Sequence, residues 1–145
     1  MVAGAIAIGS VAVWSTTCGG ESVASVEERL GDHEHITTLL PDDATALSEL
    51  YCRSATALTS NTCTVIYATS LNLRETQEHY RAIYNGRGWE RLVDNAEFGR
   101  HIWRMEWRDP AFKVVVLILE PEEWPGTPGP AGTKVVVEVT VVERK

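Results

Sequence analysis

The sequence predicts an α+β fold in which one amphipathic helix packs on an antiparallel sheet of four to five strands. Apolar side chains recur along one stripe of residues 73–85, and charged side chains lie opposite, which indicates the helix. Apolar and polar residues alternate in 103–108 and 134–143, and 112–119 is apolar almost throughout, which indicates strands. A single helix lying against one face of a meander is the simplest arrangement for this order of elements.

Before the main helix we expect a short helix and two strands. The helix should run over Ser22–Leu30, with Ser22 as its N-cap and Gly31 at its end. Residues 44–52 are weakly patterned as a strand, and Thr64–Ala68 is a better one because it is rich in β-branched and aromatic residues.

The main helix, Leu73–Asn85, should begin at Asn72, with Glu75 completing a capping box. Residues 89–93 form the next expected strand. The strand over 103–108 should turn one set of side chains towards the helix (Trp103, Met105 and Trp107) and a salt-bridged set outwards (Arg104, Glu106 and Arg108). These expectations place the core between the helix and one face of the sheet.

Residues 1–17 carry no charge and are followed by Cys18. As a helix, Val2–Thr17 would measure about 24 Å, which suits a signal sequence but is short for a bilayer core about 30 Å thick. Cys18 is the predicted lipidation site of a bacterial lipoprotein, although Ser15 and Thr17 depart from the usual lipobox residues. A retained anchor helix and a buried helix of a soluble protein are the alternatives.

The expected domain organisation follows the charge distribution. Residues 1–18 form the signal or anchor segment, 19–43 an acidic tether, and 44–145 the folded domain. The tether holds seven of the 20 acidic residues but one of the 13 Lys and Arg residues, so it carries most of the formal net charge of −7. The remainder is nearly neutral, which argues against a nucleic-acid partner.

Cys52 and Cys63 are the two remaining cysteines. In an oxidising compartment, a disulfide between them is the leading interpretation, and two buried free thiols are the alternative.

The segment Tyr67–Arg81, followed by Gly88-Trp89, resembles a known pattern. Its strand, polar turn, helix with a central Tyr-Arg and closing Gly-Trp are similar to small bacterial extracytoplasmic lipoprotein-type domains of unknown function. The resemblance covers about Leu39–Lys145. It implies a helix packed on an antiparallel meander and a location in the cell envelope, and it carries over no catalytic or binding residue.

No nucleophile elbow, phosphate loop, paired-cysteine metal motif or dinucleotide fingerprint occurs in the sequence, so we expect a non-enzymatic protein without a cofactor. The run 32–35, Asp-His-Glu-His, is dense in metal-ligand types, but neighbouring residues of a linker do not converge on one ion. We therefore expect 32–43 to be a solvated polar linker and expect no metal site. Trp124, within the Pro- and Gly-rich loop Glu120–Thr133, is the predicted partner-binding residue.

Together these features predict a membrane-tethered extracytoplasmic domain that binds or scaffolds another component of the cell envelope. Its expected partners are the membrane, through the N-terminal segment, and an envelope protein. One alternative is an accessory subunit of a larger membrane complex, held by an uncleaved N-terminal helix. Another is a small-ligand carrier, or an enzyme without a recognisable motif.

Overall fold

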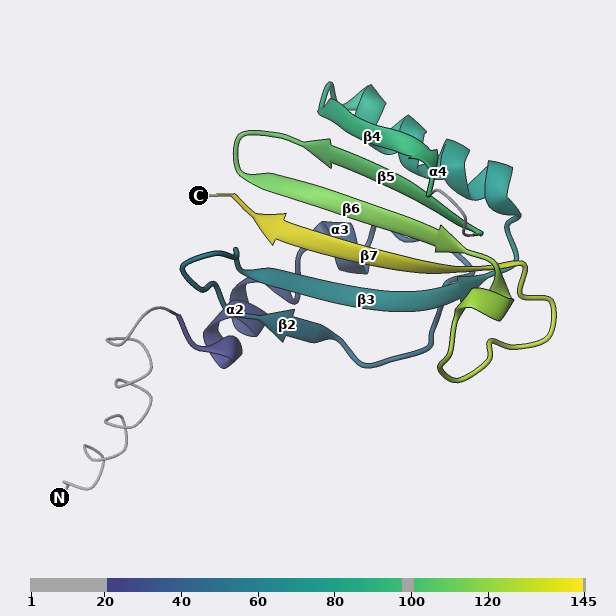
Figure 1. Ribbon diagram of the computed structural model, residues 1–145, viewed down its shortest axis with the longest axis horizontal. Helices are drawn as coiled ribbons and strands as arrows, with labels where there is room; N and C mark the ends of the chain where they lie inside the picture. The colour runs from purple at the N-terminus through teal and green to yellow at the C-terminus, as the bar shows by residue number, and fades with distance from the viewer. Residues whose placement is uncertain (1–20, 98–100, 145) are drawn as a thin grey trace, which may run out of the picture.

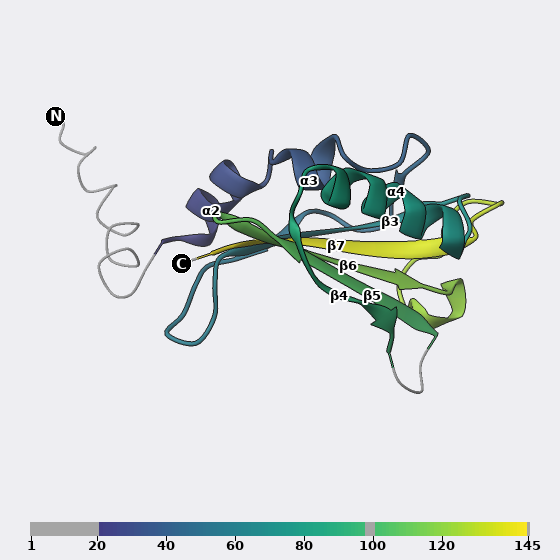
Figure 2. The same cartoon turned by 90° about the horizontal axis from the view of Figure 1, so that it is seen from above.

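The computed structural model describes residues 21–97 and 101–144. Within these residues the chain forms two layers, a seven-stranded antiparallel sheet and three α-helices that lie on one of its faces (Figures 1 and 2). The strand order is β1-β3-β7-β6-β5-β4, and β2 also pairs with β3. The α+β prediction is confirmed, but the sheet has more strands than the four to five expected.

The elements have the following bounds. The helices are α2 (Val23–Leu30), α3 (Glu34–Thr37) and α4 (Leu73–Gly86), with a single 3-10 turn, η1 (Pro121–Glu123), among the described residues. The strands are β1 (Thr45–Ala46), β2 (Tyr51–Arg53), β3 (Thr62–Thr69), β4 (Glu90–Ala96), β5 (Ile102–Arg108), β6 (Phe112–Leu119) and β7 (Val135–Glu143). The strand expected over 44–52 is two short strands, which pair with opposite ends of β3.

Helix α4 forms for the reasons that its sequence suggests. The Asn72 side chain accepts a hydrogen bond from the backbone N–H of Glu75, and the Glu75 side chain accepts one from the backbone N–H of Asn72, so the predicted capping box is confirmed. Tyr80 and Tyr84 are buried on its inner face. Gly88, with a φ of 75°, turns the chain from the helix towards β4.

The core lies between these helices and the inner face of the sheet. Strand β7 buries alternate valines, as predicted, and β5 buries Met105 and Trp107. The Trp107 ring stacks on Tyr84 with centroids 5.0 Å apart, and its Nε1–H donates to Asn85 Oδ1 at 2.9 Å. Burial of each such large apolar side chain stabilises the fold by about 1.5–3 kcal/mol.

The expectation that Asp32–Asp43 is a solvated linker is wrong. His35 and Ile36 on α3 are buried in the core, which the acidic composition of this stretch concealed. Asp43 accepts hydrogen bonds from the Thr69 hydroxyl at 2.6 Å and from the Ser70 backbone N–H at 2.7 Å. The Ser70 hydroxyl also donates to Asp43 and is the main reason that the pKa of Asp43 falls to about 2, with the Thr69 hydroxyl and the Ser70 N–H adding to it, and together these bonds hold the stretch on the end of β3.

The N-terminal part of the expected tether is also folded. Ser22 caps α2 and Gly31 ends it, as predicted, and its side chains Val26 and Leu30 are buried in the same core. The apolar helix expected over Val2–Thr17, together with Cys18, lies outside the described residues. Among residues 21–97 and 101–144, no helix has both the length and the apolar character needed to cross a membrane.

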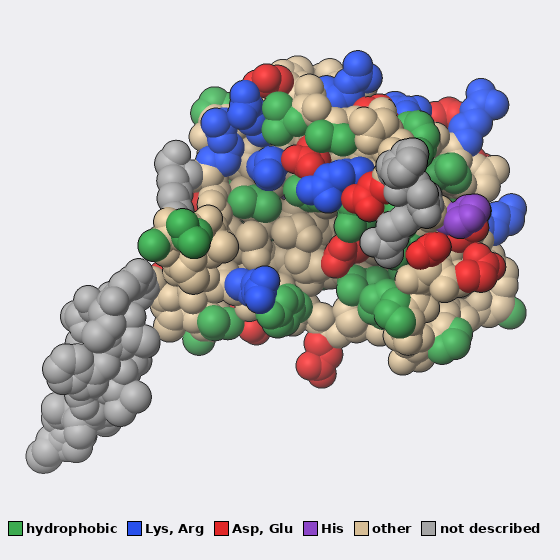
Figure 3. Space-filling model, in the orientation of Figure 1, with side chains coloured by type: hydrophobic (Ala, Val, Ile, Leu, Met, Phe, Trp, Pro, Cys, Tyr) green, Lys and Arg blue, Asp and Glu red, His purple; other side chains and the backbone are tan. Residues whose placement is uncertain are grey.

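The outer face of the sheet carries no α-helix in the described part of the chain (Figure 2). Arg104 Nε lies 2.5 Å from Glu106 Oε2, and Lys113 Nζ lies 3.5 Å from Glu106 Oε1, so the predicted salt-bridged outer surface is confirmed. Figure 3 shows acidic and basic side chains intermixed over this part of the face. Because these opposite charges are paired, this part of the face does not carry the excess of one charge that would attract an oppositely charged ligand.

The sheet has two ends that differ in what they carry. We call the end where β3 begins at Thr62 and β7 ends at Glu143 the proximal end, because α2 lies there (Figure 1). The distal end is where β6 ends at Leu119 and β7 begins at Val135. Nine residues of β7 separate the two ends, a length of about 30 Å.

Candidate functional site

The loop Glu120–Thr133 joins β6 to β7 at the distal end and folds back on the sheet. Gly129 lies so close to Ala68 that an added Cβ would come within 2.8 Å of the Ala68 Cβ atom. The Lys134 backbone N–H donates to the Thr69 carbonyl oxygen at 3.0 Å, which fixes the end of the loop to β3. This long loop is therefore a defined surface of the sheet end rather than an extended appendage.

Trp124 is half-buried within this loop. Its Nε1–H donates to the Thr127 carbonyl oxygen at 2.9 Å. A Cβ added at Gly126 would lie 2.3 Å from the Trp124 ring, so the indole packs on a position that only glycine can occupy. The sequence predicts Trp124 as a partner-binding residue of this loop, and the structure folds its ring onto the loop itself. Its role in partner binding stays a prediction.

A pocket of about 400 Å³ lies beside the loop at the distal end. Its charged and polar lining includes Glu120 and Lys134, the residues at the two stems of the loop, and His101, whose Nδ1 is 3.2 Å from Glu120 Oε2. The remaining lining is mainly apolar (Leu73, Ala96, Ile102, Trp103, Ile118, Leu119 and Val135, with Asn72). A mainly apolar lining with a few polar groups is the composition that binds an apolar group with a defined orientation.

The proximal end is organised around Asn61. Its Nδ2 donates to Glu143 Oε1 at 2.9 Å and to Glu21 Oε1 at 3.2 Å, and its Oδ1 accepts from the Ala55 backbone N–H at 2.5 Å. Arg29 pairs with both of these carboxylates, and its Nη1 is 2.5 Å from Glu143 Oε2. This network joins α2, the β2–β3 connection and the end of β7.

Glu21 is the first described residue and belongs to this network. The pKa of its carboxyl is held below the ordinary value, first by the hydrogen bond from Ser25 and then by that from Arg29. Because Glu21 is ionised and bonded to three partners, the chain enters the domain at a fixed point of the proximal end.

The predicted disulfide between Cys52 and Cys63 is present. The two residues are paired across β2 and β3, their Cα atoms are 4.0 Å apart, and both side chains face the core. The bond closes the β2–β3 hairpin at its base, with 11 residues of sequence separation. Closing a loop of this size stabilises a fold by about 3 kcal/mol.

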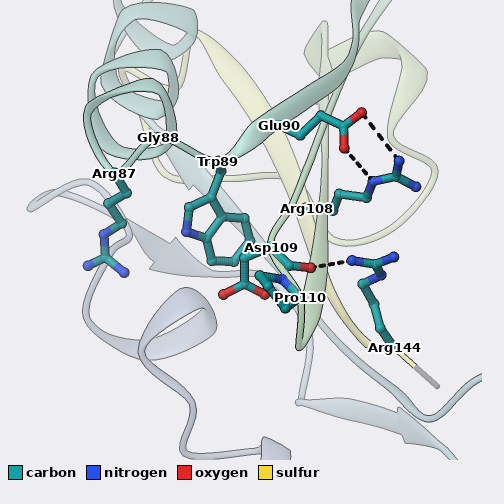
Figure 4. A pocket seen from close by; sticks show the side chains of 8 residues that line it. All are labelled: Arg87, Gly88, Trp89, Glu90, Arg108, Asp109, Pro110 and Arg144. Atoms are coloured by element: carbon teal, nitrogen blue, oxygen red, sulfur yellow. Dashed lines mark hydrogen bonds and ion pairs between the residues drawn. The ribbon is translucent and has the colours of Figure 1, made fainter.

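A second pocket, of about 480 Å³, opens between the end of α4, the β5–β6 turn and the C-terminal end of β7 (Figure 4). Two of its arginines are paired, Arg108 with Glu90 at 2.8 Å and Arg87 with Glu34 at 2.9 Å. Arg144 donates instead to the Asp109 backbone carbonyl. Because two of the three guanidinium groups are already paired, this pocket is weakly cationic.

The histidines of the 32–35 run are structural. His35 is buried, with its Nδ1 2.9 Å from the Tyr84 hydroxyl and its ring stacked on His33 at 4.6 Å. Burial lowers the pKa of His35 to about 4, so the ring is neutral at physiological pH. In the parts of the chain that the structure describes, no group of three His, Cys, Asp or Glu side chains is placed to hold a metal ion.

Neither Asn61 nor the distal pocket is predicted by the sequence. Asn61 has no recognisable pattern around it, and its partners are 40 and 82 residues away in the sequence. The pocket brings together the ends of α4, β5, β6 and β7, so only the three-dimensional arrangement shows it. No family model, curated protein or solved structure matches this chain.

Proposed function

We propose that the chain is a membrane-tethered extracytoplasmic domain that binds or scaffolds another component of the cell envelope through its distal end. The observation that carries this proposal is the position of Glu21 and of the loop Glu120–Thr133 at opposite ends of the sheet (Figure 1). A tether at Cys18 would leave the distal end directed away from the membrane, where a partner can reach it. The Cys52–Cys63 disulfide is compatible with an oxidising compartment.

The loop has the properties of a preorganised contact surface. Four prolines restrict it, and its contacts with Ala68 and Thr69 fix it on the sheet. Such restriction lowers the conformational entropy that is lost on binding. Trp124 supplies a large amphipathic ring, of the kind that dominates the energy of many interfaces.

Co-purification from detergent-solubilised membranes tests this proposal. A partner should be recovered with the full chain, and Trp124→Ala should weaken that association by more than about 1 kcal/mol while leaving the thermal stability nearly unchanged. Leu92→Ala, at an exposed position of the edge strand β4, is the matched control and should leave association unchanged. If Trp124→Ala destabilises the fold and spares the association, the loop is structural and the proposal fails.

The intact mass of the membrane-bound protein separates the two kinds of tether. Cleavage before Cys18 and acylation of that residue would identify a lipoprotein. An unprocessed N-terminus would instead identify an accessory subunit that keeps its helix over Val2–Thr17. A protein that remains in the cytosolic fraction, with Cys52 and Cys63 reduced, would exclude both.

The distal pocket favours a second candidate function, that of a small-ligand carrier. Its volume of about 400 Å³ and mainly apolar lining suit a small apolar molecule or one apolar group of a larger one. An environment-sensitive fluorescent fatty acid is a suitable probe. Leu119→Asp should abolish its binding if the pocket is the site, and unchanged binding would exclude the pocket.

A further inference from the structure

We propose that the proximal end of the domain rests directly on the bilayer surface, and that the β2–β3 hairpin inserts Leu58 into the membrane interface. This inference depends on the tether proposed above and adds to it an orientation and a second membrane contact. The occupant of this surface is the lipid bilayer itself.

The distance from the tether sets the geometry. Two residues separate Cys18 from Glu21, and the three residue steps from Cys18 to Glu21 span at most about 11 Å. Glu21 is bonded to Ser25, Arg29 and Asn61, so it does not lie on a flexible spacer. A lipid anchor at Cys18, or a helix ending at Thr17, therefore brings the proximal end to the membrane surface.

Exposed apolar side chains lie on the two elements nearest the tether. Five large hydrophobic side chains are exposed among the described residues, and three of them belong to α2 or to the β2–β3 hairpin: Val23 (48 % exposed), Tyr51 (57 %) and Leu58 (95 %). Val23 follows Glu21 by two residues, and the other two belong to the β2–β3 hairpin. Exposed apolar side chains on the elements closest to a tether indicate a surface that water does not cover in the assembled state.

The chemistry of the hairpin suits a membrane interface. Residues 54–64 contain no charged side chain. The hydroxyls of Thr56 and Thr59 are 2.9 Å apart and accept hydrogen bonds from backbone N–H groups of the turn, so the tip satisfies part of its own polar groups. Burying satisfied polar groups costs less than burying free ones, which favours entry of this tip into the headgroup region.

The base of the hairpin carries side chains that are typical of the interface itself. Tyr51 is an exposed aromatic residue, and the Arg53 guanidinium lies 5.8 Å from the centre of its ring. Tyrosine and arginine place their apolar parts in the interface and their polar ends at headgroup level. The order along the hairpin, with leucine at the tip and Tyr51 and Arg53 at the base, matches increasing polarity away from the acyl chains.

The hairpin is also held rigidly enough to insert a single side chain. The Cys52–Cys63 disulfide closes its base, and Asn61 ties it to Glu21 and Glu143. One leucine contributes little affinity by itself, but the tether supplies a high effective concentration of lipid, so a weak contact suffices to orient the domain.

The test uses the full chain, expressed in a bacterium that processes it and returned to nanodiscs of phosphatidylethanolamine and phosphatidylglycerol. One lipid carries a nitroxide label near the top of its acyl chain, and the leucine, alanine and threonine methyl groups are observed by NMR. Leu58 should be broadened several-fold more than Leu73, which is 42 % exposed at the distal end and is the matched control. Equal broadening, or stronger broadening of Leu73, overturns the inference.

A pair of variants makes the result independent of any one signal. Leu58→Asp should reduce the broadening of the Ala57 and Thr59 methyl groups, and Leu73→Asp should leave it unchanged.

Flotation of the full chain with vesicles of the same lipids tests the tether separately. A chain that does not float overturns the proposed function together with this inference, whereas a chain that floats without selective broadening overturns the inference alone. Broadening removed by an added soluble protein would mean that Leu58 belongs to a protein interface and would also overturn it.

Discussion

The two ends of this sheet are stabilised by different means. At the proximal end a disulfide, an ion-pair network and a buried histidine fix the chain through contacts between segments distant in sequence. At the distal end a loop of prolines and glycines folds largely on itself, beside an open apolar pocket. The contacts at the proximal end fix the position of the chain in the domain. The distal loop instead makes few contacts with the core, so its surface is free to contact a partner. The comparison predicts that mutations at the proximal end act on stability and that those in the distal loop act on binding.

Removal of the disulfide should have the largest effect. Cys52→Ser combined with Cys63→Ser should lower the free energy of unfolding by about 3 kcal/mol, because the unfolded chain regains the freedom that the closed hairpin removes. Urea unfolding monitored by circular dichroism measures this. Hydrogen exchange should accelerate first in β2 and α2, and equal acceleration in the distal loop would break the contrast between the two ends.

Acid should weaken the fold through His35. Its pKa is about 4 in the folded protein and about 6.5 in an unfolded chain, so protons bind preferentially to the unfolded state. The stability is therefore complete above about pH 6.5 and falls as the pH drops towards 4, by about 3 kcal/mol in total. His35→Gln should remove the pH dependence in this window, whatever its effect on stability at pH 7.

The carboxylates give a separate window for comparison. Asp43 has its pKa lowered to about 2, so the stability that it contributes is present above about pH 4 and is lost only below that. Urea unfolding of the wild type and of His35→Gln, compared between pH 7 and 4, isolates His35, because Glu138, whose pKa is raised by burial, and the other carboxylates titrate in both proteins. If the two proteins show the same pH dependence, protonation of His35 does not lower the free energy of unfolding. The buried position of His35 beside Tyr84 would then be wrong.

The sequence could predict the fold wherever its signal was local. The capping box of Asn72 and Glu75, the alternating valines of β7 and the ends of α2 all depend on neighbours within a few residues, and each was predicted. The linker prediction failed because His35 and Ile36 become buried through partners such as Tyr84, which is 49 residues away. The distal loop was recognised from its composition, but the packing of Trp124 on Gly126 required its three-dimensional course.

Substitution of one asparagine at each end of the sheet should lower the free energy of unfolding by a similar amount, which allows the two ends to be compared. Asn61→Ala removes hydrogen bonds to Glu21, Glu143 and Ala55, and Asn72→Ala removes the N-cap of α4. Each should lower the free energy of unfolding by about 1 kcal/mol. Amide exchange distinguishes them, because Asn61→Ala should expose the hairpin 54–61 while Asn72→Ala should fray only the first turn of α4. Exposure of the hairpin in both variants would show that the ends are coupled.

The smallest effect on stability should come from Gly126→Ala. A Cβ at this position would lie 2.3 Å from the Trp124 ring, so the indole must move off the loop and lose its hydrogen bond to Thr127. The loop contributes little to the core, so the free energy of unfolding should change by less than about 1 kcal/mol. The indole N–H resonance of Trp124 should shift and exchange faster with solvent, while those of Trp103 and Trp107, bonded to Asp94 and Asn85, stay unchanged.

The same variant shows which form of the loop a partner binds. If the partner binds the folded loop, Gly126→Ala weakens the association, because the loop must be ordered again on binding. We expect this result, since the prolines and the Gly126 contact restrict the loop before any partner arrives. Gly86→Ala, at a position with no atom within 4 Å of the added Cβ, is the matched control and should leave association unchanged. A stronger association in Gly126→Ala would mean that the partner takes up the released indole, and the preorganised surface proposed for the distal end would be wrong.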